Sequence, residues 1–291
     1  ATPKRHSRRT PSSDRPRTVV IGFGRMGGAL ALGLSRAGWA VSVFPRSGES
    51  LRRAVAFGLR IADHDDLANA ELCIVAVPEA AVHQVARQIL LDLGLSTALV
   101  HCAGALDLRA FGSTPMVARR MRGSFHPLVA VSDPGDPLEG HAVAVSATGR
   151  PLLQTLRRMA EDLRLFPIEV PEAKRTAYHA GAVLAAGGVV SLLSAAITAF
   201  GEAGVDAETA TRALVRLAQS ALRGVEERGV ARALTGPVKR GEVAVVEAHL
   251  AALGGGDLHL LYRLLSRRAL ELCGAQLPLE TRSALDRLLR N

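Results

Sequence analysis

The segment that most constrains the fold is TVVIGFGRMGG (18–28), in which an apolar run leads directly into spaced glycines. Gly22, Gly24 and Gly27 form a GxGxxG pattern, and helical apolar periodicity resumes after them. A second apolar run, AVSVF (40–44), follows roughly 20 residues later, as the motif requires. This strand–turn–helix–strand order predicts a dinucleotide-binding loop rather than a turn without a ligand.

Each glycine of this pattern has a separate role in such a loop. Gly22 would permit the tight turn, Gly24 would let the backbone approach a pyrophosphate, and Gly27 would let the helix pack against the strand. The amides and the dipole of the helix N-terminus would then hold the phosphate charge. We therefore predict that the loop residues Gly22, Phe23, Gly24, Arg25, Met26 and Gly27 bind the cofactor.

The end of the second apolar run indicates which dinucleotide binds. An NAD site usually places Asp or Glu there, where the carboxylate bonds the ribose hydroxyls. No carboxylate occurs between residues 14 and 49, and Arg46 and Ser47 occupy the expected position. Because a guanidinium can pair with a 2′-phosphate, we predict NADP, bound partly by Arg46 and Ser47. The alternative is that these residues are solvated surface.

Short β-like runs alternate with helical patterns up to Pro171, and only helical patterns follow. This order predicts an α/β Rossmann domain over 18–171, with a doubly wound, mainly parallel sheet, and an all-α domain over 172–291. The further β-like runs are LRI (59–61), LCIVAV (72–77), TALVHC (97–102), RGSF (122–125), HAVAVSA (141–147) and LFPIEV (165–170).

Ligands of such sheets bind beyond the carboxyl ends of the strands. Val77 and Pro78 follow one predicted strand, and Ala103 and Gly104 follow the next. We expect these four small or apolar residues to line the nicotinamide half of the cofactor site.

The basic charge is concentrated in the polar, Pro/Ser-rich stretch 1–17. It carries five of the nine net positive charges of the chain. Such a composition predicts a disordered tail, and it lacks the apolar core of a secretory signal. A nucleic-acid function would rest on this tail alone, so we expect no specific nucleic-acid partner.

The stretch Ala177–Gly201 contains no charged residue and is long enough to span a bilayer as a helix. However, it is rich in Gly, Ala, Ser and Thr, which let another helix approach closely. A helix buried in its own domain or in a dimer explains this composition better than a membrane span. We therefore expect a homodimer through the helical domain and no membrane association.

The three cysteines, Cys73, Cys102 and Cys273, are odd in number and widely spaced. This spacing disfavours a disulfide framework and a metal site, and it favours a reducing, cytoplasmic location. We expect the cysteines to be small buried side chains and expect no metal cofactor.

Several segments together resemble a bacterial family of Rossmann-like NAD(P)-dependent oxidoreductases with a C-terminal helical domain of unknown function. More distant relatives are pyrroline-5-carboxylate reductase, ketopantoate reductase, β-hydroxyacid dehydrogenases and prephenate dehydrogenase. The resemblance implies hydride transfer to or from a small carboxylate-bearing substrate, often in a dimer built from helical domains. The segments that carry it are the glycine loop, CIVAVPEAAV, HCAGAL, GSFHPL, YHAGAV and ALTGPVKRGE.

Two positions depart from these relatives. β-Hydroxyacid dehydrogenases carry Lys and, four residues later, Asn on their first long helix, whereas here Tyr178 follows Lys174. The closer family often has Asn eight residues beyond the histidine of the YH pair, and here that position is Gly187. The resemblance therefore does not transfer a catalytic mechanism or a substrate.

Hydride transfer to a carbonyl or imine needs a proton donor, and histidine is the usual one near neutral pH. His126 in GSFHPL would sit after a strand at the ligand edge, and His179 in YHAGAV would start the helix that faces it. Thr235 in LTGPVKRG could bond a substrate oxygen. We predict His126, His179 and Thr235 as catalytic residues. His101 is a weaker candidate, and structural roles are the alternative for each.

The leading interpretation is an NADP-dependent reductase acting on a small 2-oxo acid, such as a ketopantoate-like molecule, or on a cyclic imine. A prephenate-type dehydrogenase is an alternative, although the end of the second strand disfavours its usual NAD. A non-enzymatic NADP-binding sensor is a further alternative, supported by the departures at Tyr178 and Gly187.

Overall fold

The computed structural model describes residues 15–290, which divide into two compact units between Ala185 and Ala186. Most of the predicted basic tail lies outside the described residues. Its last part does not: Arg15 donates two hydrogen bonds to Asp162, at 2.9 and 3.1 Å, and Arg17 pairs with Glu71 at 3.5 Å. These two arginines are thus part of the folded unit, which corrects the expectation that they belong to a disordered tail.

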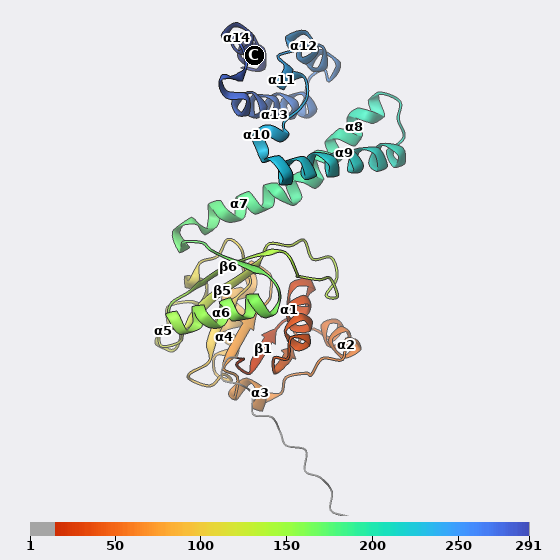
Figure 1. Cartoon of the computed structure of the whole chain (residues 1–291). Helices are drawn as coiled ribbons and strands as arrows, with labels where there is room; N and C mark the ends of the chain where they lie inside the picture. The colour runs from red at the N-terminus through yellow and green to blue at the C-terminus, as the bar shows by residue number, and fades with distance from the viewer. Residues whose placement is uncertain (1–14, 291) are drawn as a thin grey trace, which may run out of the picture. The chain divides into compact units, whose positions relative to one another are not determined.

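A seven-stranded sheet forms the centre of the first unit (Figure 1). The strand order is β2-β1-β3-β4-β5-β6-β7, and only the β5–β6 pair is antiparallel among these strands. The sequence therefore predicted the fold class correctly. The strands are β1 (Thr18–Ile21), β2 (Val41–Phe44), β3 (Leu72–Val75), β4 (Ala98–His101), β5 (Arg122–Pro127), β6 (Ala142–Ala147) and β7 (Phe166–Glu169).

Helices cover both faces of the sheet because its central strands are apolar on both sides. On one face α1 (Arg25–Arg36), α2 (Gly48–Ala56) and α6 (Arg150–Asp162) pack on alternate strand residues such as Val20 and Ile74. On the other face α3 (His64–Ala68), α4 (Val82–Ile89) and α5 (Pro115–Ala118) pack on residues such as Val19 and Cys73. Each face thus has its own buried apolar cluster.

The connections of the sheet include three short 3₁₀ turns, η1 (Glu79–Ala81), η2 (Leu108–Phe111) and η3 (Glu172–Lys174). The predicted strand LRI (59–61) is wrong as a strand: it contributes a single bridge, between Val43 and Ile61. The run is too short, and Leu59 is instead used to fill the core.

The first unit also includes helix α7 (Arg175–Ala185), which follows η3. The last strand, β7, ends close to residue 171, and only helices follow it. The boundary between the two compact units lies later, after Ala185. Residues at the start of α7 contact the sheet unit, as described below, and this explains the later division.

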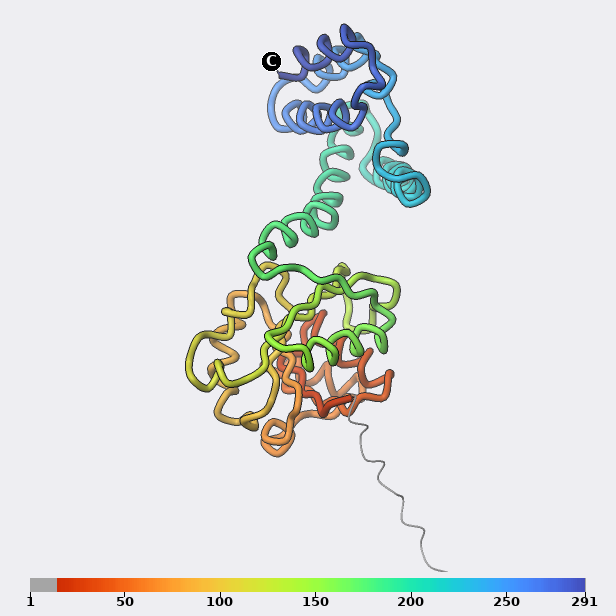
Figure 2. The backbone as a smooth tube through the Cα atoms, turned by 60° about the vertical axis from the view of Figure 1, so that its left-hand side comes forward, coloured from red at the N-terminus to blue at the C-terminus, as the bar shows by residue number. Residues whose placement is uncertain are grey.

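The second unit is entirely helical. Its buried cluster is formed by α11–α14, which pack together (Figure 2). Its helices are α8 (Gly187–Glu202), α9 (Ala207–Arg228), α10 (Val230–Ala233), α11 (Pro237–Arg240), α12 (Val243–Ala252), α13 (Asp257–Cys273) and α14 (Leu279–Arg290), with a 3₁₀ turn η4 (Gly274–Gln276).

The uncharged stretch is divided between α7 and α8 at Ala186, whose backbone (φ −105°, ψ −81°) is not helical. By length and composition alone, Glu172–Glu202 is apolar enough to cross a membrane. No residue of α8 is buried within the chain. The expectation that this stretch is buried in its own domain is therefore wrong for a single chain, and its apolar side chains are free to contact another surface.

Candidate functional site

The three glycines of the first loop differ in their surroundings as their predicted roles require. Gly22 has φ +96°, and a Cβ there would lie 2.7 Å from the carbonyl oxygen of Ala76. A Cβ on Gly27 would collide with the Gly22 carbonyl and lie 3.0 Å from Ala76 Cβ. A Cβ on Gly24 would meet nothing within 4 Å. The chain itself thus excludes side chains at Gly22 and Gly27, whereas the space beside Gly24 is open.

The start of α1 fits a pyrophosphate. Gly24 is the N-cap, no side chain caps the helix, and the first turn has no acidic residue. The first amides therefore remain available to an anion at the positive end of the helix dipole. Phe23 is only 2% exposed and its ring packs against Phe57, so this residue would offer backbone alone. Arg25 is exposed and Met26 half-buried.

The end of β2 leads into a second helix N-terminus. Ser47 is the N-cap of α2 and forms a reciprocal capping box with Ser50. Arg46 is exposed next to it, and Arg52 Nη1 lies 3.6 Å from the position of a Cβ on Gly48. Two guanidinium groups therefore lie near one helix N-terminus, an arrangement that suits a dianionic phosphate.

The loop that follows β4 is held in place from two sides. Glu79 in η1 accepts a hydrogen bond from the amide of Ala105 at 3.0 Å. Glu172 in η3 accepts one from the amide of Leu108 at 2.8 Å, and Arg175 Nη2 donates to the carbonyl of Ala103 at 3.0 Å. Because these side chains hold the loop backbone, Ala103 and Gly104 have fixed positions beyond the end of β4.

The structure brings the two predicted catalytic histidines together. His126 lies within β5, near its carboxyl end, rather than in the loop after it, and His179 lies in the second turn of α7. Their ring centroids are 5.6 Å apart. A Cβ on Gly104 would lie 2.9 Å from His126 Nε2 and would collide with His179 Nδ1. Both imidazoles therefore meet at the backbone of Gly104, next to the expected nicotinamide position.

The sequence analysis missed Tyr178, whose hydroxyl lies 2.7 Å from His126 Nδ1. The two rings meet edge to face, with centroids 5.7 Å apart and an angle of 88° between their planes. Sequence reasoning considered Tyr178 only as a departure from a relative. Its position next to His179 in YHAGAV, with β5 supplying His126, is the signal that could have suggested a shared site.

Arg175 was also missed. Its side chain is 1% exposed, and neither Nε nor Nη1 has a hydrogen-bond partner, although Glu172 Oε1 lies 4.0 Å from Nη1. Burial lowers the pKa of its guanidinium, and the nearby Glu172 opposes this effect. The sequence signal for Arg175 was its place just before the uncharged stretch 177–201. A charged residue that is buried there needs a partner for its charge.

Burial controls the protonation of this cluster. It lowers the pKa of His126 to about 4, with electrostatic effects of His179 and Arg175 as further causes. Burial raises the pKa of Tyr178 to about 12, partly offset by Arg175. At neutral pH His126 is therefore an uncharged imidazole and Tyr178 an uncharged phenol, so His126 acts as a hydrogen-bonding group rather than as an imidazolium acid.

His101 is enclosed by the protein and bonds the backbone of its own loop. It is fully buried, and its Nδ1 accepts a hydrogen bond from the amide of Ala103 at 3.2 Å. Thr235 lies in the second unit, exposed between α10 and α11, and is followed by Gly236 with φ +96°. In the same segment Arg240 donates two hydrogen bonds to Glu242, so its charge is already paired.

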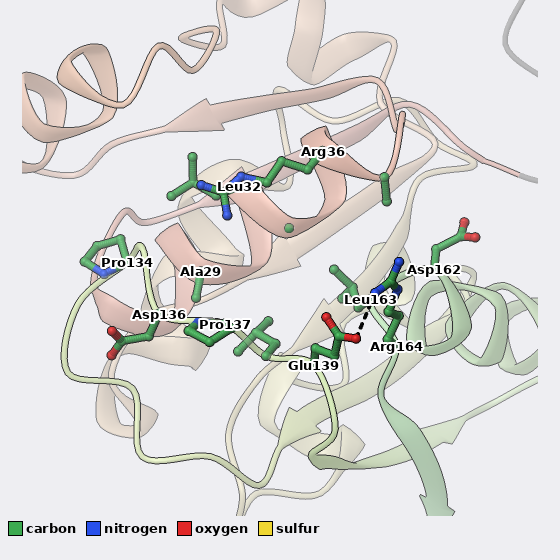
Figure 3. Close-up of a pocket in the computed structure, with 13 residues that line it drawn as sticks. Ala29, Leu32, Arg36, Pro134, Asp136, Pro137, Glu139, Asp162, Leu163 and Arg164 are labelled. Atoms are coloured by element: carbon green, nitrogen blue, oxygen red, sulfur yellow. Dashed lines mark hydrogen bonds and ion pairs between the residues drawn. The ribbon is translucent and has the colours of Figure 1, made fainter.

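A cavity of about 380 Å³ lies along the C-terminal half of α1, away from the glycine loop (Figure 3). Two of its charged groups pair with each other, since Arg164 donates to Glu139 at 2.8 Å. A third, Asp162, accepts hydrogen bonds from Arg15 and Trp39. We assign it no function. Among residues 15–290, no group of three or more His, Cys, Asp or Glu side chains is arranged to hold a metal ion.

Comparison with known families agrees with this geometry. Residues 17–100 match the model of the family described as NADP oxidoreductase, coenzyme F420-dependent. Residues 141–269 match a domain of unknown function, DUF2520. These matches indicate an oxidoreductase that uses a nicotinamide dinucleotide, as the sequence analysis expected.

Solved structures share the fold over most of the chain. A Bacteroides fragilis protein assigned to the NADP oxidoreductases is 24% identical, with a TM-score of 0.71 over 89% of this chain and 99% of its own. A Thermotoga maritima protein is 23% identical, with the same TM-score and coverage. The 1-pyrroline-5-carboxylate reductase of Streptococcus pyogenes is 16% identical, with a TM-score of 0.59 over 96% and 98%. A search of curated proteins finds no match.

Proposed function

We propose that this chain is an NADP-dependent reductase that transfers hydride to a small 2-oxo acid or cyclic imine. The observation that carries the proposal is the meeting of His126 and His179 at Gly104. This position lies beyond the carboxyl end of β4 and beside the last residues of β5, the edge at which ligands of doubly wound sheets bind. The structural likeness to a pyrroline-carboxylate reductase supports the substrate class.

The preference for NADP over NAD is part of the proposal. No carboxylate stands directly after β2, and Arg46 and Arg52 lie at the N-terminus of α2, where a 2′-phosphate would bind. The backbone of Gly22–Gly27 would hold the pyrophosphate. The side chains or backbone of Val77, Pro78, Ala103 and Gly104 would line the nicotinamide half.

Bound NADPH supplies the hydride; the residues of this chain orient the substrate and manage the proton. As a neutral imidazole, His126 can donate a hydrogen bond from Nε2 to the carbonyl oxygen or imine nitrogen, where negative charge develops during reduction. His179, whose Nδ1 also lies against Gly104, would fix the substrate beside His126. Preorganised donors of this kind act without rearranging at the moment of reaction.

The test is oxidation of NADPH by the full chain with a panel of 2-oxo acids and cyclic imines. We expect turnover with at least one member of the panel, and binding of NADPH tighter than that of NADH. Tight NADPH binding without turnover on any member would reject the reductase and favour a sensor. Equal affinity for both dinucleotides would reject the preference for NADP.

We further propose a homodimer through the helical unit, as the sequence analysis expected. Val190 is 68% exposed and Leu192 is 42% exposed on α8. An apolar groove of about 610 Å³, lined by residues of α8, α12 and α13, adjoins them. Exposed apolar surface of this extent is typical of a protein interface.

Light scattering at micromolar concentration tests the dimer. The wild type should have twice the mass of one chain, and Leu192→Glu should shift the equilibrium towards monomer because it places a charge on the apolar face. Leu279→Glu is a matched control, since Leu279 is 80% exposed at the start of α14 and lies outside this groove. A monomeric wild type would reject the proposal.

A further inference from the structure

Tyr178 is held against His126 from a different element of the fold. His126 belongs to β5 and Tyr178 to α7, and the contact joins Nδ1 to the phenolic oxygen at 2.7 Å. Nδ1 thus contacts Tyr178 of α7. Nε2 lies on the side of Gly104, 2.9 Å from the position that a Cβ on Gly104 would take. The two ring nitrogens of His126 therefore have different neighbours and can have different roles.

The chemistry of the two rings decides the direction of this hydrogen bond. A phenol is a stronger donor than a neutral imidazole N–H, and an imidazole nitrogen is a stronger acceptor than a phenolic oxygen. With both groups uncharged, the Tyr178 hydroxyl donates to Nδ1. Because the hydrogen bond at one ring nitrogen determines which nitrogen carries the proton, His126 then carries its proton on Nε2, facing Gly104.

We propose that Tyr178 acts through His126 as the source of the proton that completes the reduction, an inference that rests on the proposed function. The Nε2–H bond of His126 breaks as an O–H or N–H bond forms on the reduced substrate. At the same time the Tyr178 O–H bond breaks and a new N–H bond forms at Nδ1. His126 stays neutral throughout, and the negative charge passes from the substrate to the phenolic oxygen.

The electron balance of the step is closed by NADPH. Its hydride provides the electron pair that reduces the carbonyl or imine carbon, and the proton from His126 completes the product. After the product leaves, Nε2 of His126 takes a proton from water, and the Nδ1 proton returns to the Tyr178 oxygen. No co-reactant other than NADPH and water is needed.

One group beside Tyr178, Arg175, favours this transient negative charge, whereas burial opposes it. Arg175, one helical turn before it, lowers the pKa of the Tyr178 hydroxyl against the larger effect of burial. Two donors of Arg175 lack partners, so this cation is only partly compensated. Four other titratable groups affect the pKa values of Arg175, His126 or His101. They are Glu79, Asp107, Glu172 and His179.

A phenylalanine substitution isolates the hydroxyl. In Tyr178→Phe we expect kcat to fall roughly 10²-fold, within the range of general acid catalysis, with KM and NADPH affinity nearly unchanged. Tyr262→Phe is the matched control, because the other tyrosine of the chain makes the same contact with a histidine, His249, at 2.8 Å in the second unit. Its kcat should match that of the wild type.

The pH profile separates a relay from a purely structural contact. The kcat of the wild type should be flat from about pH 6 to pH 9, because His126 stays neutral and Tyr178 keeps its proton. In Tyr178→Phe, His126 must take its second proton from solvent, so kcat should rise as the pH falls towards 5. A proton inventory in mixed water and D₂O should show two moving protons in the wild type and one in the variant.

The tautomer of His126 can be measured without turnover. Nitrogen-15 NMR of the labelled full chain should show the proton of His126 on Nε2, and this preference should weaken in Tyr178→Phe. A proton on Nδ1 in the wild type would overturn the relay, as would a variant with wild-type kcat and pH profile. If the wild type reduces no substrate, the proposed function fails instead, and the relay fails with it even where the NMR result agrees.

Discussion

The two compact units bury apolar side chains to different degrees. In the first unit, central strand residues such as Val20, Ile74 and Val100 are fully buried between helices on both faces of the sheet. In the second unit the buried cluster is confined to α11–α14, and α8 buries no residue within the chain. The first unit therefore buries both apolar faces of its own sheet, whereas the second presents apolar side chains on α8, where we propose that a second copy docks.

The largest expected effect concerns where the chemistry lies. His126→Asn in the first unit should lower kcat by roughly 10²–10⁴-fold and leave NADPH affinity nearly unchanged, because only the proton-handling group is lost. Thr235→Val in the second unit should cost only about 0.5–1.5 kcal/mol of transition-state stabilisation, as expected for one neutral hydrogen bond. Steady-state kinetics of both variants test this comparison. A larger loss of kcat in Thr235→Val than in His126→Asn would place the chemistry in the second unit.

The second prediction compares one buried and one exposed leucine. Leu156 is a fully buried residue of α6, so Leu156→Ala should lower the free energy of unfolding by about 2–5 kcal/mol. Leu192 is 42% exposed, and Leu192→Ala should lower the stability of the isolated chain by less than about 1 kcal/mol. Urea unfolding at low protein concentration measures both. Equal losses would show that α8 has a core of its own.

The third prediction concerns the pH dependence of the first unit. Burial, with Arg175 nearby, lowers the pKa of His101 to about 4 from the ordinary 6.5. As the pH falls through this range the unfolded chain takes up a proton before the folded chain does, so stability falls between pH 6.5 and 4. The loss is at most about 3 kcal/mol. His101→Gln should remove its share of this dependence in urea titrations and leave the share of His126, whose pKa burial also lowers to about 4. An unchanged slope would assign the whole dependence to other groups.

The smallest expected effect lies at the exposed end of β2. Arg46→Asp should weaken NADPH binding by roughly 1.5–3 kcal/mol, the value of a charge-assisted hydrogen bond, and affect NADH far less. Arg60→Asp is a suitable control, since Arg60 is an exposed arginine that pairs with Asp66. Fluorescence titration measures both affinities. Equal weakening for the two dinucleotides would show that Arg46 does not contact the 2′-phosphate.

Much of the first unit was predictable from sequence because its signals are local. The apolar runs of β1 and β3 and the spacing of Gly22, Gly24 and Gly27 describe the sheet centre and the loop without knowledge of other segments. LRI (59–61) was predicted as a strand and forms only one bridge, since three residues, two of them apolar, do not distinguish a strand from core packing. The length of α7 and its break at Ala186 were not predictable, because small apolar residues on both sides continue the same pattern.

The sequence by itself determined the fold class, the glycine loop, the basic end of β2 and the histidines worth considering. These depend on residue type and on spacing within one or two neighbouring elements. Only the tertiary structure decided that α7 joins the first unit, that Tyr178 bonds His126, and that Arg175 is a buried, partly unpaired cation. His126 and Tyr178 are 52 residues apart. A contact at that separation depends on how β5 and α7 pack, and neither segment carries that information alone.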